Sequence, residues 1–139
     1  MFAKIVIVLY TKTNIYDKET FIMKKDDCIF CKLDNYVLEN DLAYAIFDIN
    51  PVSLGHMLII LKDHKENIFE TNESDRLAML DLLDQGKALI DNKHAPQGYN
   101  VCLNCGATAG QTVMHVHMHL IPRYDSEDST KVKKMVPSA

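Results

Sequence analysis

The sequence lacks the features that define several large classes of protein. No apolar run approaches the roughly 20 residues that a membrane-spanning helix needs, so we expect no association with a membrane. Basic residues run together only as pairs or in the loose cluster at 131–134, and the net charge is −4. This charge pattern argues against a general nucleic-acid-binding protein, which would need a concentrated positive surface.

The sequence also gives little support for a secretory signal. The apolar run Ile5–Tyr10 is short, and no small-residue cleavage site follows it before Lys12. We therefore expect a cytoplasmic protein. The run Ile5–Tyr10 is then expected to add an extra edge strand or to form a disordered extension, and the polar stretch Thr11–Asp27 to act as a linker.

Cysteine is scarce, but the spacing of the four cysteines is informative. They form two Cys-x-x-Cys pairs, Cys28 with Cys31 and Cys102 with Cys105. Without a secretory context, such pairs indicate metal-binding or redox sites rather than a disulfide framework.

The apolar pattern predicts an α+β fold in a chain of 139 residues, which is long enough for one domain with a substantial core. A compact turn is expected at 28–33, a single helical turn at 67–70, and strands at 36–38, 43–48, 57–61 and 99–103. Short loops between the strands favour antiparallel pairing.

One long helix is predicted over Thr71–Lys93. N-cap candidates and acidic residues at 71–75 are typical of a helix start. Its expected buried face follows helical spacing: Met79, Leu82, Leu83, Gly86, Leu89 and Ile90. A glycine inside a helix costs about 1 kcal/mol relative to alanine, and close packing of Gly86 against the sheet would explain its presence.

The most informative segment is a row of alternating histidines, His115, His117 and His119, separated by apolar residues. A strand sends successive side chains to opposite faces, so these three imidazoles are predicted to share one face with Val113 and Ile121. The other face is then expected to be core: Met114, Val116, Met118 and Leu120. Neighbours two apart on a strand are separated by about 6.6 Å, so we expect the three histidines to divide roles rather than share one ion.

Gly110–Arg123 (GQTVMHVHMHLIPR) resembles the signature of the histidine-triad (HIT) family, His-φ-His-φ-His-φ-φ with φ apolar. Phe47–His56, which precedes an apolar strand, is also similar to that family, as is Asn104-x-Gly106 ahead of the signature. Cys28–Lys32 resembles the zinc-binding start of the bacterial branch.

The resemblance extends from Asp27 to Tyr124. It implies a HIT domain at 27–125, preceded by an extension or linker at 1–26 and followed by a polar tail at 126–139. The implied fold is an antiparallel sheet of about five strands with one long helix and a short helix. The resemblance further implies a homodimer that pairs through Thr71–Lys93 and Tyr99–Leu103.

The HIT family comprises nucleotide hydrolases and nucleotidyl transferases that act on a phosphate α to a nucleoside. The resemblance implies that His117 is the nucleophile and forms a nucleotidyl-histidine intermediate, which water resolves to the nucleoside monophosphate. His119 is implied as a hydrogen-bond donor to the phosphate and the leaving group, and His56 as the residue that completes the triad. Expected substrates are nucleoside phosphoramidates, dinucleoside polyphosphates or related nucleotidyl conjugates.

The resemblance also implies a set of substrate-binding residues. Asp48 would accept hydrogen bonds from the ribose hydroxyls, and Asn104 would orient the phosphates or the leaving group. Gln111 and Thr112 lie just before the histidine row, where an amide and a hydroxyl can bind non-bridging oxygens.

A structural zinc is expected, and the resemblance assigns its ligands to Cys28, Cys31, His64 and His115. A rival site would use all four cysteines, although Cys102 and Cys105 would point to opposite faces of a regular strand. A chain without bound metal is a third alternative.

Two other functions remain open at this stage. The same histidine row could bind AMP as a sensor or interaction module without significant catalysis. Alternatively, His115 and His117 could hold a catalytic zinc in a zinc-dependent hydrolase, which would need a third ligand and an activated water.

Overall fold

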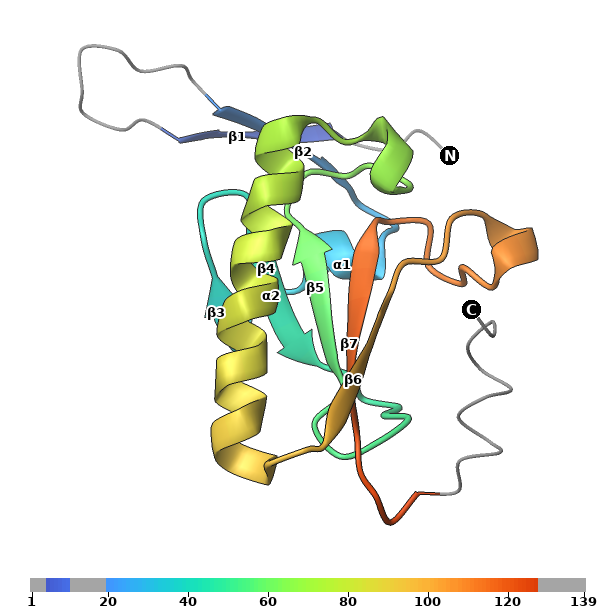
Figure 1. Cartoon of the computed structure of the whole chain (residues 1–139). Helices are drawn as coiled ribbons and strands as arrows, with labels where there is room; N and C mark the ends of the chain where they lie inside the picture. The colour runs from blue at the N-terminus through green and yellow to red at the C-terminus, as the bar shows by residue number, and fades with distance from the viewer. Residues whose placement is uncertain (1–4, 11–19, 128–139) are drawn as a thin grey trace.

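The computed structural model describes residues 5–10 and 20–127, and it arranges most of them around one antiparallel sheet (Figure 1). The strand order in this five-stranded sheet is β3-β4-β5-β7-β6. These strands span Leu38–Glu39, Ala43–Phe47, Met57–Leu61, His117–Arg123 and Gly98–Cys102, respectively. The expected α+β architecture is thereby confirmed.

The long helix α2, Glu73–His94, covers one face of the sheet (Figure 1). On that face a core forms from α2 residues such as Met79 and Leu82 and from Met57, Met118 and Leu120 of the sheet. On the opposite face, the short helix α1, Ile29–Lys32, contributes Phe30 and Cys31 to a second apolar cluster. Among the described residues, no helix combines the length and the apolar character needed to cross a membrane.

Strand register places the histidines of β7 on the α1 side of the sheet. His117 lies opposite Ile60 and His119 opposite Leu58, and both partners belong to the second apolar cluster. The intervening Met118 is packed in the α2 core, as alternation predicts. The site is therefore built on the face that α2 leaves uncovered.

Helix α2 begins and packs as its sequence indicates. The Asn72 side chain accepts from the Asp75 N–H at 2.9 Å, and the Asp75 carboxylate accepts from the Asn72 N–H at 3.1 Å, which forms a capping box. Gly86 is buried, and a Cβ there would lie only 2.7 Å from the Met57 Sδ. Close approach of the helix to the sheet thus explains this glycine.

Three details of the sequence prediction are corrected by the structure. The histidine strand begins at His117, so His115 lies in a bend before it and Met114 is exposed rather than in the core. Ile5–Tyr10 forms a strand, β1, but not at the edge of the main sheet, because it pairs with β2, Thr20–Lys25, in a separate ribbon. Part of the expected linker is therefore a strand.

The remaining elements differ from the prediction by small shifts. The expected strand at 36–38 is found at Leu38–Glu39, and that at 99–103 at Gly98–Cys102. The compact turn at 28–33 is the helix α1, and short helical turns occur at Ile68–Glu70 (η1) and Ala107–Ala109 (η2).

Candidate active site and metal centre

Two cysteines and two histidines converge beside α1, with one ligand atom of each within 4.8 Å of the others: Cys28, Cys31, His64 and His115. Cys28 precedes α1 and Cys31 lies within it, whereas His64 follows β5 and His115 lies just before β7. Three segments distant in sequence thus bring together the residues expected to bind zinc. Cys102 and Cys105 belong to no such group in the described part of the chain.

The distances within this cluster fit a tetrahedral metal ion. The Cys31 Sγ lies 3.2 Å from the His64 Nδ1 and 3.4 Å from the His115 Nδ1, and the Cys28 Sγ lies 3.4 Å from the same His115 atom. Zinc bonds of about 2.3 Å to sulfur and 2.0–2.1 Å to nitrogen would separate these ligands by about 3.6 Å in a tetrahedron. The two-thiolate, two-imidazole donor set also suits zinc.

A hydrogen bond outside the cluster orients His115. Its Nε2–H donates to the Leu61 carbonyl oxygen at 2.6 Å, which leaves the Nδ1 lone pair facing the sulfurs. Burial lowers the pKa of His115 to about 4, so the ring is neutral at pH 7 and able to bind a metal. Burial raises the pKa of the Cys31 thiol to about 11, so a thiolate there needs a bound cation.

His117 lies at the start of β7 and outside the metal cluster. Its Nδ1–H donates to the carbonyl oxygen of His115 at 2.7 Å, so Nε2 is the ring nitrogen that is left to act as a nucleophile. The ring of Phe30 packs edge-on against it, with centroids 5.1 Å apart. An imidazole oriented in this way is a suitable nucleophile. Because His115 joins the cysteines and His117 does not, the geometry disfavours a catalytic zinc shared by His115 and His117.

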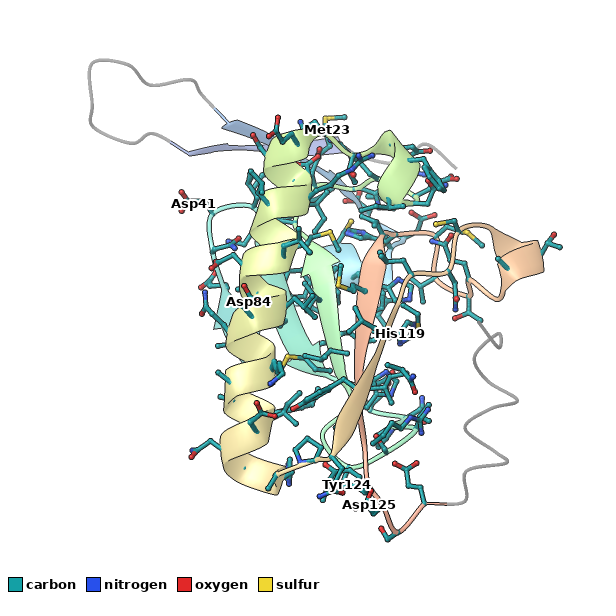
Figure 2. All side chains as sticks on the ribbon, in the orientation of Figure 1. Met23, Asp41, Asp84, His119, Tyr124 and Asp125 are labelled. Atoms are coloured by element: carbon teal, nitrogen blue, oxygen red, sulfur yellow. The ribbon has the colours of Figure 1, made fainter. Side chains whose placement is uncertain are left out.

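His56 and His119 form a hydrogen-bonded pair beside His117. The His56 Nε2 lies 2.9 Å from the His119 Nδ1, and the Val52 N–H donates to the His56 Nδ1 at 3.1 Å. Neutral His56 therefore carries its hydrogen on Nε2 and donates it to His119. His119 (labelled in Figure 2) must then carry its own hydrogen on Nε2, which makes it a hydrogen-bond donor.

Burial keeps both of these rings neutral. It lowers the pKa of His119 to about 4, with further contributions from His117 and His56, and it also lowers the pKa of His56. The Asp48 carboxylate, 3.7 Å from the His56 Nε2, acts in the opposite direction, but burial is the larger effect. The pair is thus a neutral donor chain at physiological pH.

The same arrangement disfavours a metal at this second cluster. Ligand atoms of Asp48, His56 and His119 do lie within 4.8 Å of one another. A neutral His56 that bound a metal through Nε2 would carry its hydrogen on Nδ1, where the Val52 N–H already donates. Histidine ligands normally donate their second N–H to an acceptor, and here that position faces a donor.

A cleft of about 390 Å³ adjoins the two histidines of β7. Its polar lining includes four of the predicted site residues: Asp48, Thr112, His117 and His119. Its apolar lining comes chiefly from α1 and the segments around β4: Ile29, Phe30, Leu33, Ile46 and Ile49. Ile49 is 86% exposed and Ile29 is 55% exposed, so apolar surface is left open at this cleft. Such a mixture is typical of a pocket for a small molecule with a flat apolar part.

The structure places Asn104 and Gln111 away from that cleft. Asn104 lines a neighbouring cavity of about 460 Å³, which it shares with His119 and residues of β6. Gln111 is buried, and its Nε2 donates to the carbonyls of Glu66 at 2.6 Å and Val113 at 3.0 Å. Its amide therefore ties loops together in this structure, a placement that the sequence pattern does not indicate.

Three groups that shape the site were not identified from the sequence: the Val52 N–H, the Leu61 carbonyl and the Phe30 ring. The first two are main-chain groups, so no residue type could have indicated them. Phe30 lies between the two cysteines of the first Cys-x-x-Cys pair, and that position was the only available signal.

Known proteins resemble this chain in both sequence and structure. The sequence model of the HIT domain matches residues 32–126. An adenosine 5′-monophosphoramidase of Candida albicans is 38% identical over 108 residues, which cover 70% of this chain and 71% of that protein. The crystal structure of a HIT family protein from Bacillus anthracis has a TM-score of 0.68 at 38% identity and covers 73% of this chain and 76% of its own.

A zinc-bound histidine triad family protein from Mycobacterium smegmatis is also similar, with a TM-score of 0.66 at 27% identity. That match covers 73% of this chain and 78% of the other. The fold and the clustered histidines define a histidine-triad protein, and the chain belongs to the HIT family. The resemblance drawn from the sequence is thereby confirmed.

Proposed function

We propose that this chain hydrolyses nucleoside phosphoramidates or related nucleotidyl anhydrides through a nucleotidyl-His117 intermediate and releases the nucleoside monophosphate. The proposal rests on the hydrogen bond from the His117 Nδ1–H to the His115 carbonyl. Because Nδ1 carries the hydrogen, the Nε2 of this cleft-lining ring is left to attack phosphorus. The monophosphoramidase activity named for the Candida albicans relative supports this substrate class.

The reaction would proceed in two displacements. In the first, the His117 Nε2 attacks the α-phosphorus, and the bond to the leaving group breaks with its electron pair going to that group. In the second, a water oxygen attacks the same phosphorus, the nitrogen–phosphorus bond breaks, and its electron pair returns to Nε2. The net reaction consumes one water, whose hydrogens end on the released leaving group and on the nucleoside monophosphate, and it regenerates His117.

His119 and Asp48 would position the substrate. The Nε2–H of His119 would donate a hydrogen bond to the phosphate, where negative charge increases in the transition state. The Asp48 Oδ1 accepts from the Asn50 N–H at 2.9 Å, which orients a carboxylate that could accept from ribose hydroxyls. Thr112, which lines the cleft, would contact a phosphate oxygen. Gln111 would act indirectly, by holding the loop in place.

We propose further that Cys28, Cys31, His64 and His115 bind a structural zinc ion. The donor set and the observed separations fit that ion, and the zinc-bound relative from Mycobacterium smegmatis supports it. The ion would fix the fold around α1, and no open ligand position is needed for the proposed chemistry. Its ligand His115 also supplies the carbonyl that orients His117.

A homodimer is the proposed assembly, paired through α2 and the edge strand β6. Leu77 and Leu80 are exposed on α2, and Val101 is exposed on β6, which lies at the edge of the sheet. Sedimentation velocity would test this assembly, and a monomer at micromolar concentration would contradict it. A Leu80→Glu variant is expected to shift the protein to monomer.

Single-turnover mixing with a fluorogenic adenosine phosphoramidate and with a diadenosine polyphosphate tests the catalytic proposal. Wild type should release AMP and should carry radiolabelled AMP on the protein during turnover, in a linkage that is lost in acid and kept in base, as a nitrogen–phosphorus bond to histidine requires. His117→Ala should lose both and still bind AMP in calorimetry. His94→Ala is the matched control, because His94 belongs to neither histidine cluster.

Equal turnover by wild type and His117→Ala would refute the nucleophile assignment. AMP binding without release from either substrate would favour the alternative of a nucleotide-binding module.

A further inference from the structure

The strand β2, which lies before the residues matched by the HIT-domain model, makes a direct main-chain contact with the turn that carries His64. The Met23 N–H donates to the Asp63 Oδ1 at 2.6 Å, and the His64 N–H donates to the Met23 carbonyl at 2.7 Å. Both polar main-chain groups of Met23 (labelled in Figure 2) are therefore directed at Asp63 and His64.

The same strand leads directly to the first cysteine ligand. The Cys28 N–H donates to the carbonyl of Lys25, the last residue of β2, at 3.2 Å. Ile22, one residue before the contact with Asp63, is only 3% exposed, so this part of β2 is anchored by burial. The segment from Met23 to Cys28 thus connects the His64 turn with the start of α1.

The turn after β5 also contacts the segment that carries His115. The Lys65 carbonyl accepts from the N–H of Val116, the residue after His115, at 2.7 Å. The Lys65 Nζ lies 2.6 Å from an Asp75 carboxylate oxygen at the start of α2 and 3.7 Å from the Asp63 carboxylate. Residues 63–65 therefore connect β2, the His115 segment and α2, and the side chain of Asp63 accepts a hydrogen bond from the main chain of β2.

We propose that Asp63 is a positioning residue for the metal centre, because its carboxylate fixes β2 against the His64 turn and thereby fixes the imidazole ligand. This inference rests on the zinc centre proposed above. Groups that orient a ligand without touching the metal typically change metal affinity by about 10–100-fold when removed. The hydrogen bond to Met23, rather than the negative charge, is the contact that matters.

The test is the rate at which zinc-loaded full-length protein releases zinc to an excess of a chromophoric chelator. Asp63→Ala removes the acceptor and should release zinc at least about 10-fold faster than wild type. Asp63→Asn keeps an oxygen that can accept from the Met23 N–H, so it should release zinc within about 2-fold of wild type. Asp84→Ala is the control, because Asp84 is an exposed acid on α2 (Figure 2).

A second variant removes the same hydrogen bond from the other side. Met23→Pro lacks the donor N–H but keeps the carbonyl. In the wild type the Met23 N–H donates to Asp63 and not to a neighbouring strand, so the proline removes no hydrogen bond between strands. This variant should release zinc as fast as Asp63→Ala, and it keeps the test open if Asp63→Ala does not fold. Cobalt-loaded Asp63→Ala should also show an altered visible spectrum, which reports a changed ligand arrangement.

Release by Asp63→Ala within about 2-fold of wild type would overturn the inference, and so would equally fast release by Asp63→Asn and Asp63→Ala. If the wild type takes up no zinc, the metal centre and this inference fail together. If the wild type binds zinc but hydrolyses no nucleotide conjugate, the catalytic proposal fails and the release rates still decide the role of Asp63.

Discussion

The His117 Nδ1 lies 2.7 Å from the carbonyl oxygen of His115 and donates its hydrogen to it. His115 therefore has two functions: its side chain faces Cys28 and Cys31, and its main chain fixes the tautomer of the proposed nucleophile. Disturbing the metal cluster is expected to move that carbonyl. This relationship links the proposed metal centre to catalysis although no reacting atom needs to touch the metal.

Replacing a proposed zinc ligand should impair both stability and turnover. Wild type purified without added metal should contain about one zinc per chain, and Cys28→Ser should contain much less. Loss of a structural metal costs several kcal/mol, so the melting temperature of Cys28→Ser should fall by about 10 °C or more. Metal analysis and thermal unfolding measure both effects.

Cys102→Ser is the matched control for this prediction, because Cys102 is exposed and lies outside the cluster. It should keep its zinc, its melting temperature and its turnover. Zinc loss from Cys102→Ser as well would instead favour the site made of all four cysteines.

Removing the donor His119 should slow the chemical step more than it weakens binding. His119→Ala lacks the Nε2–H that is expected to stabilise charge on the phosphate, so kcat should fall by about 10²–10³-fold. His119→Gln keeps a side-chain N–H and should lose less. Steady-state kinetics with an adenosine phosphoramidate give both values, and a change confined to KM would contradict the assignment.

Acidification should destabilise the protein partly through His119. Burial, together with His117 and His56, lowers the pKa of His119 to about 4, whereas an unfolded histidine titrates near pH 6.5. As the pH falls, the unfolded state takes up this proton first. The contribution of His119 to the free energy of unfolding is therefore fully present above about pH 6.5 and is lost progressively down to about pH 4. Urea unfolding at pH 7 and pH 5 should show this loss.

His119→Gln cannot bind that proton, so it should lose less free energy of unfolding than wild type between the two pH values. The difference should be about 1 kcal/mol after a discount for the partial exposure of the ring. Equal losses in the two proteins would contradict the prediction.

Gly86→Ala should destabilise the protein although alanine favours helix by about 1 kcal/mol. The new Cβ would lie 2.7 Å from the Met57 Sδ and 3.3 Å from the Leu120 Cδ2, in a fully packed region. Overpacking of this kind costs about 1–3 kcal/mol, so we expect a net loss of about 1 kcal/mol in chemical denaturation. In a Met57→Ala background, Gly86→Ala should become stabilising. If it still lowers the free energy of unfolding in that background, the steric explanation is refuted.

Much of the fold could be predicted from the sequence because local patterns define it. The apolar run Met57–Leu61 is the fully buried central strand β5, and the spacing of Met79, Leu82, Gly86 and Ile90 marks the buried face of α2. The ribbon of β1 and β2 could not be predicted in this way. Its two strands are separated by polar residues in the sequence, and its contacts to the rest of the chain include Asp63 and His64, which are distant in sequence.

The histidine row shows the limit of periodicity. Alternation correctly separates His117 and His119 from Met118 and Leu120, because these residues lie in the regular strand β7. It is wrong for Met114, because the chain bends at 113–115 and turns His115 toward the cysteines. Long-range contacts override local alternation at that point.

The chemical groups of the site can be identified in the amino-acid sequence: the metal-binding residue types, the row of histidines and the acidic Asp48. Which ring nitrogen each histidine leaves available is set by the folded chain. That choice depends on main-chain groups of other segments, namely the Leu61 carbonyl for His115 and the Val52 N–H for the His56–His119 pair. A neutral imidazole carries a hydrogen on only one of its two nitrogens. A single fixed donor or acceptor from a distant segment therefore sets the role of the whole ring.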